Sequence, residues 1–185
     1  MAEVSVVFVD RDGVINVRPD FERQKFYILK QEEFVFEKNA IDGLKMLSDA
    51  GKMIIVITNQ SCIGRGLISE KEIIEIHTHM TRELAACGVK ITDVLFCPHT
   101  PEAGCKCRKP EIGLFTEAAK KWGVCLGASW MIGDMTSDIR AGHLAGCKTI
   151  LTKTGCAGGD KKYEEKPDFV AADLVEVAKI VLGRM

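Results

Sequence analysis

Short apolar runs alternate with amphipathic stretches along most of this chain. The first run, VSVVFV at residues 4–9, is almost continuously apolar and rich in β-branched residues, and it stops at Asp10. Such a run is typical of a strand that is buried on both faces of a sheet. Similar runs predict further strands over residues 52–58, 91–97, 129–134, 147–152 and, in a shorter form, 168–171.

The stretches between these runs have the periodicity of helices. Over residues 39–51, the side chains of Ile41, Leu44 and Leu47 fall on one helical face. A longer helix is predicted over residues 69–88, because Ser69 is followed three residues later by a glutamate, the pattern of a capping box. Three more helices are predicted over residues 111–123, 135–146 and 173–183.

Buried strands that alternate with helices predict an α/β fold with a doubly wound, mostly parallel, Rossmann-like sheet. The chain has 185 residues, 46% of them hydrophobic, so residues 1–185 are expected to form a single domain. Helices take up most of the sequence between the strands, and we therefore expect no large cap domain. The short tract 17–36 and a cysteine-containing loop at 97–107 must then shape the site.

Composition narrows the expected partners and location. The formal net charge is −1, which favours neither a nucleic-acid nor a membrane partner. The N-terminal segment lacks the features of a signal peptide, and no apolar run approaches the ~20 residues needed to span a bilayer. Eight cysteines without an export signal favour a cytoplasmic protein whose clustered cysteines bind metal. A monomer is the favoured state.

Polar residues follow each of the first four predicted strands. In a parallel sheet the carboxyl ends of these strands meet at one edge, so we expect the residues to gather there. They are, strand by strand, Asp10, Arg11 and Asp12; Thr58, Asn59, Gln60 and Ser61; Arg108 and Lys109; and Asp134 and Asp138.

The carboxylates in this set suggest a magnesium site. Asp10 and Asp12 would be an ordinary turn in the simplest interpretation. Held close together, however, two carboxylates repel each other and need a cation or a shared proton. Asp134 adds a third carboxylate, and Mg²⁺ prefers a few carboxylates together with water and a substrate phosphate. Thr58 is then placed to hold phosphoryl oxygens, and Lys109 to offset the charge that builds in the transition state.

The stretch CPHTPEAGCKC has the spacing of a zinc site. Cys97, His99, Cys105 and Cys107 offer three thiolates and one imidazole, a closed tetrahedral set with no position left for chemistry. Incidental cysteines and a Cys105–Cys107 disulfide are the alternatives. A structural zinc would clamp the loop so that the next two residues, Arg108 and Lys109, leave it in a fixed direction. Pro110 is expected to start the following helix.

The whole constellation resembles the haloacid dehalogenase superfamily of phosphohydrolases. The motifs are DRDGVIN, Thr58, Lys109 and G-D-x-x-x-D, and they span almost the whole chain. The phrases TNQS-x-x-x-RG and C-P-H…C-x-C-R-K-P are similar to those of a narrower family of manno-heptose bisphosphate and histidinol-phosphate phosphatases.

This resemblance implies a role for each matching residue. Asp10 would be the nucleophile that forms an aspartyl-phosphate, and Asp12 the general acid and base. Mg²⁺ would lie between Asp10, the backbone carbonyl of Asp12 and Asp134, with Asp138 in support. The substrate-binding residues would be Arg11, Thr58, Asn59, Gln60, Ser61, Arg65, Arg108 and Lys109.

Three functions follow from these observations. The first is removal of the 7-phosphate from a manno-heptose 1,7-bisphosphate, the second is hydrolysis of histidinol phosphate, and the third is phosphate binding without turnover. The substrate would be a small phosphorylated sugar or an amino-alcohol phosphate. Met135, where the heptose enzymes often have lysine, and the segment VRPDFERQKF depart from the heptose pattern. His77 and His79 are interpreted as ordinary helix residues.

Overall fold

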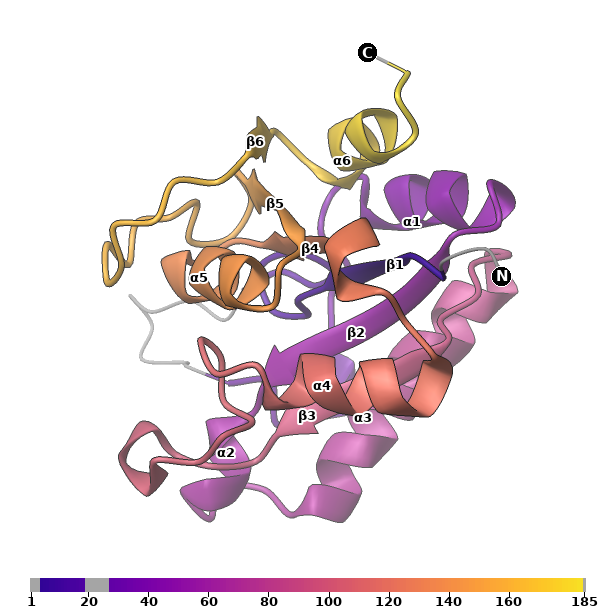
Figure 1. The fold of residues 1–185 in the computed structure, drawn as a ribbon. Helices are drawn as coiled ribbons and strands as arrows, with labels where there is room; N and C mark the ends of the chain where they lie inside the picture. The colour runs from indigo at the N-terminus through magenta and orange to yellow at the C-terminus, as the bar shows by residue number, and fades with distance from the viewer. Residues whose placement is uncertain (1–3, 19–26, 185) are drawn as a thin grey trace.

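A computed structural model describes residues 4–18 and 27–184 of the chain. Six strands form one sheet in the order β3-β2-β1-β4-β5-β6, and every pair of neighbours is parallel (Figure 1). The strands are β1 (Val6–Val9), β2 (Met53–Asn59), β3 (Asp93–Cys97), β4 (Trp130–Gly133), β5 (Lys148–Thr152) and β6 (Phe169–Ala171). This confirms the predicted doubly wound α/β sheet. The strand order reverses between β1 and β4, and ligand sites of such sheets lie at this point.

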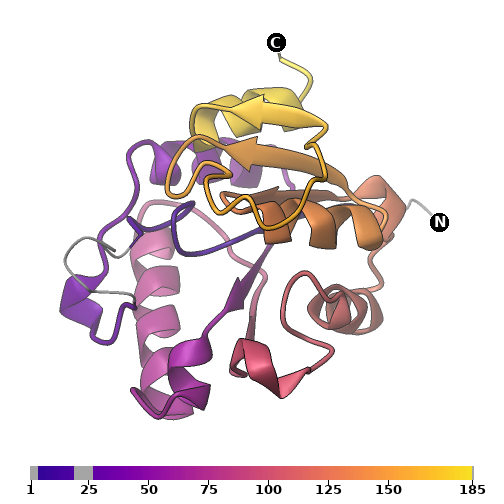
Figure 2. The same cartoon turned by 90° about the vertical axis from the view of Figure 1, so that its left-hand side faces the viewer.

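Helices cover both faces of the sheet. They are α1 (Ala40–Asp49), α2 (Ser61–Gly64), α3 (Glu70–Ala86), α4 (Gly113–Trp122), α5 (Thr136–Leu144) and α6 (Leu174–Val181). Because side chains alternate along a strand, Val7 and Val9 pack with one set of helices, α1, α3 and α6. Val6 and Phe8 pack with α4 and α5 on the other face. In Figure 2 the magenta α3 and the orange α5 lie on opposite sides of the sheet.

The connections between strands contain two differences from the sequence prediction. The short helix α2 follows β2 directly, in a segment for which the sequence predicted neither a helix nor a strand. Helix α4 begins at Gly113 rather than at Pro110, so the prediction that Pro110 starts this helix is wrong. The reason is a turn after the cysteine loop, closed by a hydrogen bond from the Glu111 amide to the Arg108 carbonyl (2.8 Å). The predicted capping box of Ser69 is confirmed.

The described residues form no second sheet beside the main one, in agreement with the predicted absence of a large cap domain. Part of the tract 17–36, residues 19–26, lies outside the described residues. The rest of it contains a 3₁₀ turn at Gln31–Glu33, and its Val17 amide bonds to the Val35 carbonyl (2.8 Å). Within the part of the chain that the structure covers, no helix has the length and apolar character required to cross a bilayer.

Candidate functional site

A cavity of about 250 Å³ opens at the carboxyl edge of the sheet, beside the point where the strand order reverses. The residues that follow β1, β2, β3 and β4 all contribute to its wall, as the sequence predicts. Its lining consists of Asp10, Asp12, Arg18, Tyr27, Thr58, Asn59, Ser61, Arg108, Lys109, Met135, Ser137, Asp138 and Lys162.

Lys109 is buried at the base of this cavity between two carboxylates. Its Nζ atom lies 2.7 Å from Oδ1 of Asp10 and 2.8 Å from Oδ1 of Asp138, and it donates to the Ile57 carbonyl (2.8 Å). Burial alone would lower the pKa of Lys109, but the two carboxylates outweigh this effect and raise it. The side chain is therefore a fixed positive charge next to Asp10.

Three buried carboxylates form an acidic cluster around this lysine. One oxygen from each of Asp10, Asp134 and Asp138 lies within 4.8 Å of the others. Burial raises the pKa of Asp10 to about 6, although Lys109 opposes the shift, and burial raises the pKa of Asp134 to about 7 against the opposing charge of Arg18. Raised pKa values indicate that the negative charge of the cluster is under-compensated.

One atom of this cluster is poised for a cation. Oδ1 of Asp134 is buried without a hydrogen-bond partner, whereas Oδ2 accepts from Arg18 (2.6 Å) and from the Cys156 amide (2.7 Å). Buried polar atoms are normally paired, and hard carboxylate oxygens are what Mg²⁺ prefers. The donor set therefore fits Mg²⁺. Among the described residues, this cluster contains the carboxylate of Asp138, which was expected to support the Mg²⁺ ligands. It does not contain the Asp12 carboxylate.

The Asp12 carboxylate instead faces three donors. Arg11 binds both of its oxygens through Nη2 (2.8 and 2.9 Å), Asn16 donates to Oδ1 (3.0 Å) and Gln60 to Oδ2 (2.9 Å). Burial favours a raised pKa, but Arg11 and the other donors outweigh it and hold the pKa of Asp12 below its usual value. The side chain still lines the cavity.

Three predicted substrate-binding side chains lie outside the cavity lining. Arg11 is 0% exposed and lies behind Asp12, and Gln60 is buried between Asp12 and Thr58. Arg65, at the end of α2, is exposed and does not contribute to the wall. Arg11 and Gln60 therefore hold the Asp12 carboxylate, and a substrate contact by these three side chains stays a prediction. Nothing in the local sequence indicates the direction of Arg11 and Gln60, because it depends on packing around β1 and β2.

Other predicted residues line the cavity, and they have further contacts. Asn59 donates from Nδ2 to the Lys109 carbonyl (3.2 Å) and accepts from the Lys109 amide (3.0 Å). Arg108 donates to the His99 carbonyl (3.2 Å), which ties it to the cysteine loop. Thr58, near the end of β2, and Ser61, at the start of α2, are both buried, and the Ser61 hydroxyl lies 3.3 Å from that of Tyr27.

Four residues that the sequence did not mark as site residues also line the cavity, namely Arg18, Tyr27, Ser137 and Lys162. Arg18 and Tyr27 belong to the tract 17–36 that was expected to shape the site, but nothing in the sequence marked them individually. Lys162 lies in the long loop between β5 and β6, which Asp160 ties to Thr136 of α5 through a bond to the Thr136 amide (2.9 Å). This bond and the one from the Lys162 amide to the Thr136 hydroxyl (3.2 Å) bring Lys162 to the cavity, and both are tertiary contacts.

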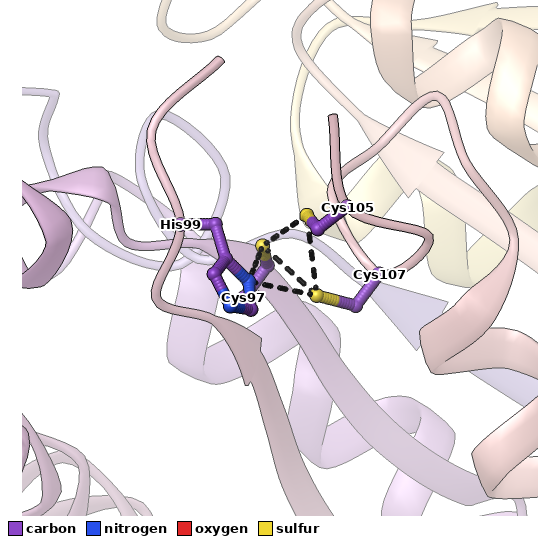
Figure 3. A group of neighbouring side chains, drawn as sticks. All are labelled: Cys97, His99, Cys105 and Cys107. Carbon is purple, nitrogen blue, oxygen red and sulfur yellow. Dashed lines mark hydrogen bonds between the residues drawn. The ribbon is translucent and has the colours of Figure 1, made fainter. Parts of the chain in front are cut away.

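The four metal-ligand candidates of the cysteine loop converge on one point (Figure 3). The Sγ atoms of Cys97, Cys105 and Cys107 lie 3.1–3.5 Å apart, and Nδ1 of His99 lies 3.3 Å from Sγ of Cys107 and 3.5 Å from that of Cys97. A tetrahedral zinc with Zn–S bonds of ~2.3 Å needs sulfur–sulfur separations of roughly 3.8 Å. The observed sulfur–sulfur distances are roughly 0.3–0.7 Å shorter than in that geometry, so a small outward shift of the side chains would admit a zinc ion. The three cysteines form no disulfide.

This cluster is also packed against the site. Gly64 of α2 donates its amide to the Pro98 carbonyl (2.9 Å), and Gly113 of α4 donates to the Lys106 carbonyl (2.9 Å). A Cβ atom at Gly113 would lie 2.4 Å from the Lys106 oxygen, so this close approach requires glycine. The cysteine loop is therefore held by α2, whose Ser61 lines the cavity, and by α4.

Comparisons with known proteins agree with this fold and site. A family model described as "HAD-hyrolase-like" matches residues 106–177. The chain is 39% identical to D-glycero-alpha-D-manno-heptose-1,7-bisphosphate 7-phosphatase of Photorhabdus laumondii, over 83% of this chain and 85% of that protein. It is 34% identical to D-glycero-beta-D-manno-heptose-1,7-bisphosphate 7-phosphatase of Pseudomonas aeruginosa, over 82% of each.

A solved structure gives the same result. D,D-heptose 1,7-bisphosphate phosphatase from B. bronchiseptica, complexed with magnesium and phosphate, superposes with a TM-score of 0.88 at 30% identity, over 98% of this chain and 99% of that one. The fold and these relatives define the class of the chain as a phosphatase of the haloacid dehalogenase superfamily. Within that class, the chain belongs to the family of D-glycero-D-manno-heptose 1,7-bisphosphate 7-phosphatases.

Proposed function

We propose that this chain removes the 7-phosphate of D-glycero-D-manno-heptose 1,7-bisphosphate in a Mg²⁺-dependent reaction. The observation that carries the proposal is the position of Asp10. Its carboxylate lines the cavity, is paired with Lys109 at 2.7 Å and belongs to the acidic cluster that fits a cation. The relatives that act on this substrate cover most of the chain.

In the first step, an Asp10 oxygen attacks phosphorus and forms a new P–O bond. The negative charge of the bound phosphate raises the pKa of Asp12 above its low value in the free site, so that Asp12 carries a proton when the substrate is bound. The P–O bond to the sugar breaks, its electron pair stays on the sugar oxygen, and Asp12 gives that oxygen its proton. In the second step, water attacks the aspartyl-phosphate and passes a proton to Asp12, which releases phosphate and restores the Asp10 carboxylate. Lys109 neutralises charge next to the reacting carboxylate throughout.

The residues that would hold Mg²⁺ are Asp10, Asp134 and Asp138, and the Asp12 backbone carbonyl is the further ligand that the family resemblance implies. When bound there, Mg²⁺ supplies positive charge that offsets the repulsion between Asp10 and a phosphoryl group. Thr58, buried at the end of β2 and lining the cavity, would bind a phosphoryl oxygen.

Zn²⁺ would be held by Cys97, His99, Cys105 and Cys107 and would be structural, since all four ligands come from the protein. Free cysteines of this kind suit a reducing compartment, so the cytoplasm remains the expected location.

Two cations on the cavity wall support a substrate with two anionic groups. Arg108 and Lys162 line the cavity in addition to Lys109, whereas Arg18, which also lines it, is paired with Asp134. A phosphate placed at Asp10 leaves Arg108 and Lys162 to bind a second anion at the rim. We therefore expect a bisphosphate to bind better than the corresponding monophosphate.

A phosphate-release assay with Mg²⁺ tests the proposal. Both anomers of the heptose bisphosphate and histidinol phosphate are supplied as substrates, and ³¹P NMR reports which phosphate is lost. Loss of the 7-phosphate with retention of the 1-phosphate is expected. Faster release from histidinol phosphate would replace the proposed substrate, and tight phosphate binding with no release from any substrate would exclude turnover.

A further inference from the structure

His77 is a buried polar residue on an otherwise apolar face of α3. It is 5% exposed and lies beside Ile73, Ile76 and Met80, which are all buried in the core. Its ring makes an edge contact with Phe96, with the ring centres 5.3 Å apart. The mechanism above makes no use of it, and a histidine buried in this way needs a hydrogen-bond partner.

The partner of His77 is Arg11. Nη1 of Arg11 lies 3.0 Å from Nε2 of His77, and both side chains are buried. The guanidinium is always protonated and can only donate, so Nε2 must accept and the ring proton must be on Nδ1. Burial and the neighbouring charge of Arg11 lower the pKa of His77 to about 3, which agrees with a neutral acceptor ring.

The same guanidinium also binds Asp12. Its Nη2 atom donates to both carboxylate oxygens of Asp12, and its Nε atom lies 3.2 Å from Oδ1. Within the described part of the chain, the hydrogen-bond partners of this guanidinium are Asp12 on one side and His77 on the other. A planar, rigid group that is bound at both ends cannot rotate without losing one of its contacts.

Asp12 is the only member of this three-residue chain that reaches the cavity. The side chains of Arg11 and Asp12 are 1% and 21% exposed, and Asp12 lines the cavity whereas Arg11 and His77 do not. The chain His77–Arg11–Asp12 thus runs from the core of α3 to the reacting edge of the sheet. A small displacement at a reacting group has a large effect on rate, so the anchor at the buried end matters.

We propose that His77 is a positioning residue for the phosphatase reaction, which holds Arg11 so that Arg11 keeps the Asp12 carboxylate in its place at the cavity wall. This inference rests on the proposed function, in which Asp12 donates a proton to that oxygen as its bond to phosphorus breaks. His77 acts through Arg11 and does not touch the substrate.

The proposed role predicts which substrates are hydrolysed more slowly when His77 is replaced. An alkyl phosphate has a strongly basic leaving oxygen that needs the proton of Asp12, whereas the nitrophenolate of p-nitrophenyl phosphate leaves without one. A misdirected Asp12 should therefore slow the first substrate more than the second. The quantity to compare is kcat/KM, because it reports the steps up to departure of the leaving group and excludes hydrolysis of the aspartyl-phosphate.

The variants are His77→Asn, whose side chain is too short to reach Arg11, and His77→Gln, whose amide oxygen can replace Nε2 as an acceptor. We expect His77→Asn to lose about 10- to 100-fold in kcat/KM on the sugar phosphate, within the range for impaired acid–base catalysis, and much less on p-nitrophenyl phosphate. His77→Gln should recover most of the loss. His79→Gln is the matched control, because His79 on the same helix also lies against a guanidinium, that of Arg82 at 3.1 Å, away from the cavity.

Equal losses on both substrates in His77→Asn, or no recovery in His77→Gln, would overturn the inference and leave His77 a core residue only. If His77→Asn proves too unstable to assay, His77→Leu takes its place, because leucine fills the apolar site but accepts no hydrogen bond from Arg11. The proposal expects His77→Leu to lower kcat/KM more on the sugar phosphate than on p-nitrophenyl phosphate, and equal effects on both substrates would overturn it. Absence of turnover in the wild-type protein would be a failure of the proposed function instead.

Discussion

Asn59 and Lys109 are joined by two hydrogen bonds that run in opposite directions. The Asn59 amide group donates to the Lys109 carbonyl, and the Lys109 amide donates back to the Asn59 side-chain oxygen. The end of β2 thus fixes the backbone of the residue whose Nζ atom contacts Asp10. Lys109 has two anchors, the cysteine loop before it in the chain and Asn59 from the neighbouring strand.

The first prediction concerns this second anchor. Asn59→Ala removes both hydrogen bonds, each worth about 1 kcal/mol, and leaves the Lys109 backbone free to shift. We expect kcat to fall about 10-fold while zinc content, measured by elemental analysis, stays at the wild-type level. A zinc loss that accompanied the fall in kcat would mean that the two anchors are not independent.

Lys109→Ala tests the charge itself. Removing a charge that stabilises the transition state should reduce kcat about 10²- to 10³-fold. It also leaves Asp10 and Asp138 without their buried partner, so the melting temperature in Mg²⁺-free buffer should fall, as breaking a buried ion pair is costly. Calorimetry measures the melting temperature, and elemental analysis checks that zinc remains bound. An unchanged melting temperature would contradict the buried contact.

Cys107→Ser tests the cysteine loop. Loss of a ligand should reduce zinc content and the free energy of unfolding together, because structural zinc contributes directly to folding. Since Asn59 still holds Lys109, the loss in kcat should be smaller than in Lys109→Ala. Full kcat and KM in a zinc-free Cys107→Ser protein would show that the loop does not position the cations.

Asp10→Asn tests covalent catalysis. An amide cannot form the aspartyl-phosphate, so turnover should be abolished, and rapid quench with ³²P-labelled substrate should show no labelled protein. This variant keeps all four zinc ligands of the cysteine loop, so a wild-type zinc content shows that the protein is folded. Near-native turnover would exclude the aspartyl-phosphate.

The pH dependence of Mg²⁺ binding follows from the raised pKa values of Asp10 and Asp134, about 6 and 7 against the model-peptide value of 3.8. Without Mg²⁺, the folded state binds more protons than the unfolded state between pH ~4 and 7, so the contribution of these two groups to stability is lost as pH rises through that window. His77, whose pKa is lowered to about 3, contributes in the opposite direction.

The contribution of His77 to stability is the same with and without Mg²⁺ at a given pH. It therefore drops out of the difference between the two melting temperatures. We expect Mg²⁺ to raise the melting temperature more at pH 8 than at pH 5, because protons compete for the same carboxylates at the lower pH. Asp134→Asn should remove most of this increment, and NaCl at matched ionic strength should not reproduce it. An increment that is larger at pH 5 would contradict the assignment.

The sequence by itself determined the architecture and the set of reacting groups. Apolar runs such as residues 6–9 have no polar position that could face water, so only a strand covered on both faces accommodates them. In a parallel sheet, whatever follows each strand must arrive at one edge, which placed Asp10, Thr58, Lys109 and Asp134 together before any contact was known. The cysteine spacing likewise defined its cluster, because all four ligands lie within one short loop.

Only the tertiary structure decided the direction of each side chain at that edge. Arg11 carries a charge and follows Asp10, so the sequence favoured a substrate contact, yet packing of β1 against α3 buries it between Asp12 and His77. His77 has an ordinary helical position in the sequence and gains its role from a residue 66 positions away. Such pairings depend on how helices pack on the sheet, and local sequence patterns carry no information about them.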